Sequence, residues 1–304
     1  MKPLVPLEDM EQIANGVDHP EGICKTLDGI VYLSGEAGQI YRIEPDDTFT
    51  EVANTGGFTL GLAADSHGMI YACDPANKRV YRVDPDSGAV EEFSAGTPQA
   101  PFKNPNWGAF DSRGNYYVSD SGGWKTADGR IFLVRPGRAT EVWSEESRDF
   151  PNGMAVSPDE SSLWVLESTP GRLLRFPIRD DHTAGPMEVL ADLTGSVPDG
   201  IAFATDGSVV ISCYRPDIVY RWSASSGLEV LGHDPEGTVL AAPTNVVFTG
   251  PDLDILVMPN IGRWHATRFR VPGLSGVPLF YPNADQLGIE PEVQDGMKLS
   301  DRKD

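Results

Sequence analysis

The sequence predicts an all-β protein, a six-bladed β-propeller, and three observations lead to this fold class. A pattern of about 45 residues recurs six times along the chain, a period typical of propeller blades. Each copy contains four short strand-like segments, as a blade of four antiparallel strands requires. The 304 residues include 32 Gly and 25 Pro, a composition that suits a fold rich in turns. No change in composition divides the chain, so we expect a single domain over residues 1–304.

Each copy begins with a residue that precedes a short apolar strand, and we call these residues the ring positions. They are Glu21, Leu60, Asn106, Asn152, Asp199 and Thr244. The clearest copy continues from Asp199 through the apolar segment 200–203 to the turn Asp206-Gly207. Asp-Gly between two β-rich segments is a strong signal for a hairpin. The first two strands of each blade are therefore expected to form a hairpin.

The remaining strands follow in the same order in every copy. The third strand alternates apolar and polar residues, as in segments 40–43 and 80–83, and this period of two is typical of a half-buried strand. A fourth, more polar strand follows, as in segment 50–53. The predicted blades cover approximately residues 17–57, 58–100, 101–147, 148–194, 195–240 and 241–284.

The N-terminal segment is expected to close the ring. Glu11-Gln-Ile-Ala-Asn15 resembles the fourth-strand sequence Glu51-Val-Ala-Asn54, although no first strand precedes it. An open sheet edge is prone to unwanted pairing, so residues 1–16 are predicted to supply the outer strand of the sixth blade. Residues 285–304 form an acidic tail, whose last residues, Ser300–Asp304, are expected to be loose.

Composition and charge exclude several classes of partner. The formal net charge of −21 opposes binding to nucleic acid and to anionic membranes, since both recruit Lys and Arg. The chain contains no apolar run of about 18 residues and no secretion signal. The three cysteines, Cys24, Cys73 and Cys213, have no metal-binding spacing and suit a reducing compartment. We therefore expect a cytoplasmic protein; its oligomeric state stays open.

The ring positions should converge, because the first strand of every blade lines the central channel of a propeller. Glu21 and Asp199 supply two carboxylates, and Asn106 and Asn152 supply two carboxamides. Hard oxygen donors with two negative charges match a divalent cation, which would also relieve repulsion between the carboxylates. Pro-Asn-Gly and Pro-Asp-Gly also occur as ordinary turn sequences, but their shared register favours the metal site. Ca²⁺, Mn²⁺ or Mg²⁺ fits this set better than a structural zinc, because no His or Cys belongs to it.

Four short motifs carry a resemblance to a known family: His19-Pro-Glu-Gly22, Asn104-Pro-Asn106, Phe150-Pro-Asn-Gly153 and Val197-Pro-Asp-Gly200. The chain resembles the senescence-marker protein (regucalcin)/gluconolactonase family of six-bladed propeller hydrolases over essentially its whole length. The resemblance implies that Glu21, Asn152 and Asp199 hold one divalent ion, Ca²⁺ in first place and Mn²⁺, Mg²⁺ or Zn²⁺ as alternatives. It also implies that Asn106 binds the metal through water or contacts substrate, and that Asp199 is the base in lactone hydrolysis.

One residue departs from the family pattern. Family members that bind sugar lactones often carry Arg two residues before the equivalent of Asn106, where this chain has Asn104. An amide cannot copy the fixed fork of donors of a guanidinium. A preference for sugar-acid lactones is therefore not expected.

The loops between the second and third strands should lie on the same face as the ring positions. They carry aromatic and Arg residues that, together with Asn104 and Asn106, are predicted to contact a small polar or anionic substrate. These residues are Trp124, Tyr214, Arg215, Arg263 and Trp264. The alternative is that Trp124 and Trp264 only close gaps between blades.

The leading functional hypothesis is a metal-dependent hydrolase that opens a small lactone, with Asp199 as the general base. The alternatives are a non-catalytic calcium- or ligand-binding propeller, and a related propeller enzyme that acts on another ester. No nucleophile elbow, zinc-protease motif or nucleotide-binding loop is present in the sequence. A small-molecule substrate is therefore the expected partner.

Overall fold

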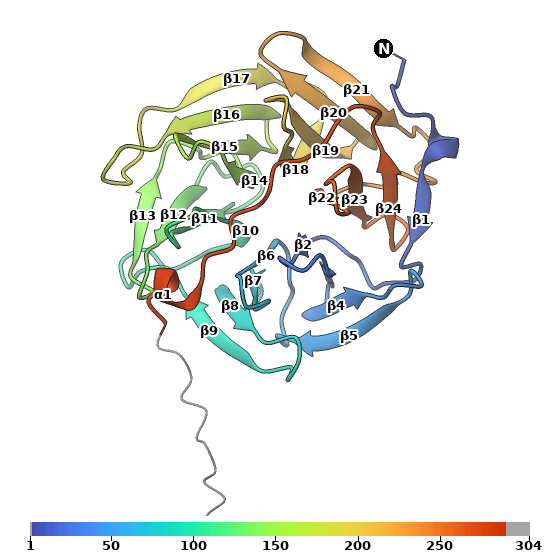
Figure 1. The fold of residues 1–304 in the computed structure, drawn as a ribbon. Helices are drawn as coiled ribbons and strands as arrows, with labels where there is room; N and C mark the ends of the chain where they lie inside the picture. The colour runs from blue at the N-terminus through green and yellow to red at the C-terminus, as the bar shows by residue number, and fades with distance from the viewer. Residues whose placement is uncertain (1, 290–304) are drawn as a thin grey trace, which may run out of the picture.

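The computed structural model describes residues 2–289 and contains six antiparallel sheets of four strands, arranged around a central axis (Figure 1). This confirms the six-bladed propeller. In each sheet the strand nearest the axis comes first and the chain then runs outward through neighbouring hairpins (Figure 1). The segments in which apolar and polar residues alternate thus form strands of these sheets, as expected for a period of two.

The strands of the first three blades follow directly along the chain. Blade 1 contains β2 (Ile23–Lys25), β3 (Val31–Ser34), β4 (Gln39–Ile43) and β5 (Phe49–Asn54). Blade 2 contains β6 (Leu62–Ala64), β7 (Ile70–Asp74), β8 (Arg79–Val83) and β9 (Val90–Ser94). Blade 3 contains β10 (Pro105–Phe110), β11 (Tyr116–Asp120), β12 (Arg130–Val134) and β13 (Thr140–Ser144).

The second half of the ring repeats this order until the last blade. Blade 4 contains β14 (Pro151–Val156), β15 (Ser162–Glu167), β16 (Arg172–Pro177) and β17 (Glu188–Asp192). Blade 5 contains β18 (Val197–Phe203), β19 (Val209–Arg215), β20 (Ile218–Ser223) and β21 (Gly227–His233). Blade 6 contains β22 (Val247–Thr249), β23 (Ile255–Asn260) and β24 (His265–Arg270) from this end of the chain.

The N-terminal segment supplies the fourth strand of blade 6. After a short 3₁₀ helix (Leu7–Asp9), β1 (Glu11–Ile13) pairs antiparallel with β24, and Gln12 lies opposite Thr267. The Arg268 guanidinium binds the carboxylates of Glu11 and Asp47, both at 2.7 Å. The predicted ring closure is therefore confirmed, and one Arg links the closing strand to blade 1.

Apolar side chains fill the spaces between neighbouring blades. One cluster joins Tyr71 and Phe93 of blade 2 to Tyr116 and Phe132 of blade 3, and similar clusters occupy the other junctions. The three cysteine thiols are buried and unpaired. Because each blade packs on both neighbours, the inner strands have little freedom, and the ring positions are held on a rigid frame.

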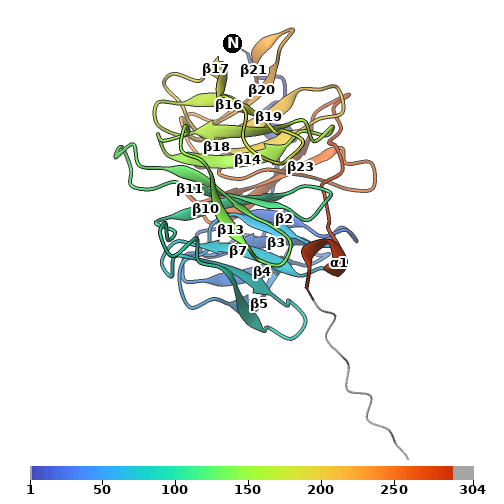
Figure 2. The same cartoon turned by 90° about the vertical axis from the view of Figure 1, so that its left-hand side faces the viewer.

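The C-terminal segment after β24 was not predicted by the repeat. It crosses one end of the central channel, and Figure 2 shows it on the face opposite to the loop that joins β11 and β12. Backbone hydrogen bonds tie it to the turns of several blades: Thr205 to Ser275, Gly276 to Leu253, and Ser66 to Pro282. It ends in helix α1 (Ala284–Leu287), which Asn283 caps through its side chain.

The tail expected from residue 285 is therefore described only as far as Ile289, where it is partly helical. The predicted loose end, Ser300–Asp304, lies outside the described residues. Within residues 2–289, none of the helices has the length and apolar character needed to span a membrane.

Candidate functional site

A repeated hydrogen bond places the ring positions in equal register. The backbone N–H that follows Glu21, Asn106 or Asp199 donates to a Ser hydroxyl twelve residues further on. The three bonds join Gly22 to Ser34 (2.7 Å), Trp107 to Ser119 (3.1 Å) and Gly200 to Ser212 (3.2 Å). Ser119 also donates to the Asn152 carbonyl of the next blade at 2.9 Å. Ser34, Ser119 and Ser212 thus fix the ring positions of blades 1, 3 and 5 against the second strand of the same blade, and Ser119 also links blade 3 to blade 4.

Glycines after the ring positions let the inner strands approach closely. A Cβ on Gly22 would lie 1.8 Å from the Leu60 carbonyl oxygen, and one on Gly153 would lie 2.2 Å from the Asp199 carbonyl oxygen. No side chain fits into such a space. The motif of a ring residue followed by Gly therefore has a packing reason, and it brings the ring side chains together around the axis.

Three polar ring residues are almost fully buried: Asn106 is 3%, Asn152 4% and Asp199 6% exposed. Glu21 is partly exposed. The Asn152 amide donates to the Ser168 hydroxyl at 3.2 Å, and the Asn245 amide donates to Asp199 Oδ1 at 3.4 Å. The Oδ1 atoms of Asn152 and Asn245 are buried without a hydrogen-bond partner. Unpaired buried carbonyl oxygens are rare and costly. These two oxygens are therefore suited to bind a cation.

Both ring carboxyls resist ionisation in this environment. Burial raises the pKa of Glu21, and the negative charges of Asp199 and Glu36 raise it further. Burial also raises the pKa of Asp199, although hydrogen bonds from Asn245 and Asn152 partly oppose this. A cation held between these groups would favour their charged forms.

Asn245 is a residue that the sequence reasoning missed. The ring position of blade 6 was assigned to Thr244, whose hydroxyl instead donates to the Glu21 backbone carbonyl at 2.8 Å and so joins blade 6 to blade 1. The next side chain, Asn245, reaches Asp199. The signal was present in the sequence, because the sixth copy carries Asn245 where four others carry Gly.

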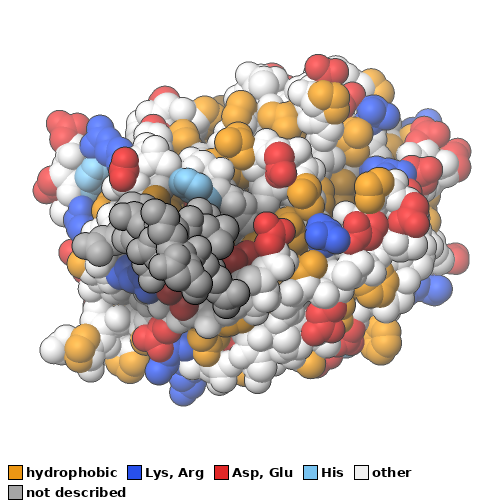
Figure 3. Space-filling model, turned by 60° about the horizontal axis from the view of Figure 1, so that its bottom comes forward, with side chains coloured by type: hydrophobic (Ala, Val, Ile, Leu, Met, Phe, Trp, Pro, Cys, Tyr) orange, Lys and Arg blue, Asp and Glu red, His pale blue; other side chains and the backbone are white. Residues whose placement is uncertain are grey.

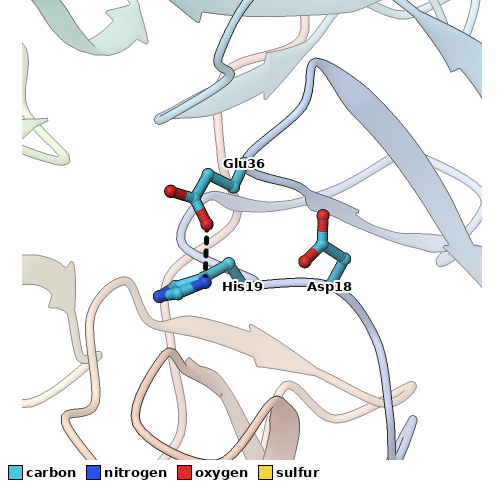
Figure 4. Close-up of side chains that lie close together, drawn as sticks. All are labelled: Asp18, His19 and Glu36. Carbon is cyan, nitrogen blue, oxygen red and sulfur yellow. Dashed lines mark ion pairs between the residues drawn. The ribbon is translucent and has the colours of Figure 1, made fainter.

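A second group of potential ligands lies beside Glu21. The carboxylate of Glu36 points at a ring nitrogen of His19, with Oε2 2.7 Å from Nδ1, and Asp18 lies close by (Figure 4). One donor atom from each of the three residues lies within 4.8 Å of the other two. All three side chains are at least partly exposed, and Gln39 already donates to Asp18. Two members of this group closely precede Glu21 in the chain, and the negative charge of Glu36 acts on the Glu21 carboxyl.

Two of the predicted substrate-binding aromatic residues, Trp124 and Trp264, lie on loops between second and third strands. Tyr214 and Arg215, expected in such a loop, instead end strand β19. Trp124, 49% exposed, packs edge-on against Phe150 with the ring centroids 5.0 Å apart. Trp264, 47% exposed, lies 5.5 Å from the His19 ring. Since large exposed apolar side chains are informative when they gather on one face, these two stay candidates for ligand contact.

The predicted polar contacts are partly occupied by the protein itself. The Asn104 amide donates to the Gly122 carbonyl at 3.1 Å and so holds the β11–β12 loop. The Arg215 guanidinium lies over the Tyr214 ring, 4.6 Å from its centroid, with the carboxylate of Asp217 at 3.6 Å. Arg263 is exposed. Whether these residues contact substrate stays a prediction.

Further along the axis the channel becomes apolar. A cavity of about 110 Å³ is lined by inner-strand residues such as Ile23, Met154 and Ile201, and the C-terminal segment closes it with Phe280 and Tyr281. The lining of this cavity consists mostly of apolar side chains. The oxygen atoms that could bind a cation therefore lie at the ring positions and not in this cavity. Access to the ring positions is therefore expected from the face that carries the loops.

On the one face that Figure 3 shows, charged side chains of both signs are scattered over the described residues. Many Arg side chains form ion pairs with carboxylates that lie close to them, as Arg42 does with Glu44 at 2.9 Å. This distribution agrees with a solvated acidic surface.

The chain is similar to several known proteins. A family model described as the SMP-30/gluconolactonase/LRE-like region matches residues 20–261. The 6-deoxy-6-sulfogluconolactonase of Pseudomonas putida is 28% identical over 279 residues, covering 80% of this chain and 88% of that protein. The adipocyte plasma membrane-associated protein of Salmo salar is 26% identical over 229 residues; the match covers 65% of this chain but only about half, 54%, of that protein.

A solved structure supports the fold. Regucalcin from Agrobacterium tumefaciens, described as a calcium-binding protein, superimposes with a TM-score of 0.72 at 16% identity, covering 89% of this chain and 96% of that one. With the family model matched over most of the chain, this protein belongs to the SMP-30/gluconolactonase/LRE-like family.

Proposed function

We propose that this protein hydrolyses a small lactone with the help of one divalent cation, held by Glu21, Asn152 and Asp199 with Asn245 as a further donor. The observation that carries the proposal is the pair of buried, unpartnered amide oxygens of Asn152 and Asn245 beside two carboxyls of raised pKa. Membership of a family that includes gluconolactonases supports the reaction class.

The donor set fits a hard cation. Glu21 and Asp199 supply carboxylate oxygens, and Asn152 and Asn245 supply amide oxygens. All four are oxygen donors, as Ca²⁺, Mg²⁺ and Mn²⁺ prefer. Ca²⁺ is the first choice, because it accepts irregular sets of neutral and charged oxygens more readily than Mg²⁺ does. When bound, the cation would polarise the lactone carbonyl and stabilise the negative charge that develops on its oxygen.

The side chains supply the proton transfers. Asp199 accepts a proton from the attacking water, whose oxygen forms the new bond to the carbonyl carbon. The bond between this carbon and the ring oxygen then breaks, and the leaving alkoxide takes the proton back to give the hydroxy acid. The Asn245 amide, 3.4 Å from Asp199 Oδ1, orients the carboxyl and leaves its other oxygen for the water. Asn106 would contact the substrate or bind the cation through a water molecule.

The test combines metal binding with turnover. The chelator-treated protein is titrated with Ca²⁺, Mn²⁺, Mg²⁺ and Zn²⁺ by calorimetry, and proton release is then measured with simple and sugar lactones at neutral pH. The Glu21→Ala variant removes both carboxylate oxygens and should lose most of the metal affinity and the activity while remaining folded. Leu60→Ala is the matched control at an apolar ring position, and its metal affinity should stay within a few-fold of wild type.

Two results would contradict the proposal. Full metal occupancy of Glu21→Ala would show that Glu21 is not a ligand. Metal binding by the wild-type protein without hydrolysis of any lactone or ester would instead favour the alternative of a non-catalytic calcium-binding propeller.

A further inference from the structure

The residues two positions before each ring position form a second layer around the axis, which we call the outer tier. Five blades carry Pro directly before the ring position, blade 2 carries Thr59 there, and all six of these residues are buried. The residues one step earlier are partly exposed in five blades: His19, Phe58, Asn104, Phe150 and Val197. Two residues span at most about 7 Å of chain, so this outer tier lies next to the donor ring.

Aromatic pairs occupy opposite sides of this tier. Trp264 of blade 6 packs on His19 of blade 1, and Trp124 of blade 3 packs on Phe150 of blade 4. In a ring of six blades, the junction between blades 6 and 1 lies opposite the junction between blades 3 and 4 (Figure 1). Each Trp leaves about half of its surface exposed. Any substrate that reaches the ring therefore passes between two aromatic surfaces.

The rest of the tier offers few hydrogen-bonding groups. Phe58 and Val197 are apolar, and Leu60 occupies one ring position beside them. Asn104 stands where relatives that bind sugar lactones often carry Arg, and its amide already donates a hydrogen bond to the Gly122 carbonyl. A polyhydroxylated lactone would leave hydroxyl groups facing these apolar side chains without partners, which is costly.

We infer that the site is selective for lactones whose ring carries an extended apolar substituent, with Trp124 and Trp264 as the specificity-determining residues. This inference rests on the proposed function. The lactone carbonyl faces the donor ring, and the substituent lies along one of the aromatic pairs, where it covers exposed tryptophan surface. Each buried methylene contributes roughly 0.8 kcal/mol, about a fourfold change in an equilibrium constant.

The experiment compares kcat/KM for δ-valerolactone, δ-decanolactone and glucono-δ-lactone. We expect δ-decanolactone to exceed δ-valerolactone by about tenfold or more, because five further carbons gain apolar contact. Trp124→Ala and Trp264→Ala should each reduce this gain, the ratio of kcat/KM for δ-decanolactone to that for δ-valerolactone, several-fold. Trp→Phe at the same positions should restore most of the gain. Val189→Ala is the matched control, because Val189 is 49% exposed on an outer strand.

Binding of the lactam analogue of δ-decanolactone separates this inference from the proposed function. If no lactone is hydrolysed, the proposed reaction fails, but lactam binding that weakens several-fold in the two Trp→Ala variants still supports the apolar site. Lactam affinity unchanged in both variants overturns the inference. A higher kcat/KM for glucono-δ-lactone than for δ-decanolactone also overturns it, and leaves the hydrolase proposal standing.

Discussion

Asp199 combines two demands that usually conflict within one side chain. As a metal ligand it must be ionised, yet its burial beside Glu21 raises its pKa in the absence of a cation. The hydrogen bond from the Asn245 amide stabilises the ionised form and occupies only one of the two oxygens. The second oxygen is therefore the atom expected to accept the proton of water.

Replacing Asp199 by Asn separates these two roles. The amide keeps the shape and one oxygen donor, so metal should still bind, although more weakly because one negative charge is lost. It accepts no proton near neutral pH, and loss of a general base typically costs about 10²–10⁴-fold in rate. We expect turnover to collapse even at saturating metal, measured as rate against metal concentration. Recovery to within about tenfold of wild type would assign the base elsewhere.

The polar ring residues could be predicted because they recur at one position in successive copies. Glu21, Asn106, Asn152 and Asp199 each stand at or just before the start of the first strand of a blade. For Glu21, Asn106 and Asp199 the structure gives this register a physical cause, the hydrogen bond from the following backbone N–H to a Ser hydroxyl. Asn245 was missed because one residue was taken from each copy, and Thr244 filled that place. The left-handed backbone of His19 (φ 41°) and Phe150 (φ 63°), which places both next to a Trp, has no counterpart in the sequence pattern.

At the scale of the element, buried carboxyls end the second strand of several blades and hold the segment that leads to an inner strand. Asp74 accepts the N–H of Phe58 at 3.2 Å, and Glu167 accepts the N–H of Asp149 at 3.0 Å. Asp120 accepts the N–H groups of Lys103 and Asn104 in the same way. These acids position the chain before Leu60, Asn106 and Asn152. The oxygens of Asp120 are thus engaged by backbone N–H groups.

Asp120→Ala should therefore destabilise the protein rather than abolish the chemistry. Two partly buried N–H groups lose their acceptor, and an unsatisfied group of this kind costs at most about 1–3 kcal/mol. We expect a lower midpoint in urea, with metal stoichiometry unchanged. Asp252→Ala, at an exposed turn, is the control and should leave the midpoint near the wild-type value. If Asp120→Ala instead keeps its stability and loses turnover, Asp120 acts in catalysis.

The strands were predictable as elements because alternation, turns and spacing repeat together, whereas the C-terminal segment follows no template. After Arg270 the sequence contains neither a ring position nor a Gly-containing hairpin, so the repeat carried no information about it. Its path is set by contacts with parts of the chain distant in sequence, such as Phe203 with Val277 and Lys25 with Tyr281. Contacts of this kind are specified by the assembled ring and not by local pattern.

For the whole molecule, closure depends on a strand of only three residues. Ile13 of β1 is 3% exposed and packs in the cluster between blades 6 and 1, with Val17, Val257 and Ala266. Removing its side chain leaves a cavity at the point where the ring closes.

Ile13→Ala should lower the free energy of unfolding by about 2–5 kcal/mol, the usual range for this truncation in a core. Gln12→Ala, on the exposed side of the same strand, should cost less than about 1 kcal/mol, since it loses one exposed hydrogen bond to Thr238. Urea unfolding followed by circular dichroism measures both. Equal effects for the two variants would show that β1 contributes backbone pairing alone.

The same ring couples stability to pH and to metal. The pKa values of Glu21 and Asp199 are raised in the metal-free folded protein, chiefly by burial, so the folded state binds their protons more tightly than the unfolded chain does. The contribution of these groups to stability is therefore present at low pH. It falls as the pH rises from the ordinary carboxyl range near 4 through the raised folded values.

We accordingly expect the Tm of the chelator-treated protein to fall between pH 5 and 8 more steeply than that of the double variant Glu21→Gln/Asp199→Asn, in which neither group titrates. Saturating Ca²⁺ should flatten the wild-type curve, because a bound cation favours the ionised carboxylates and binds only the folded protein. The double variant should respond little to Ca²⁺. Calorimetric scans across this interval measure all four curves. If the metal-free wild type and the double variant have parallel curves, the two carboxyls do not share a confined site, and the coordination scheme built on them is wrong.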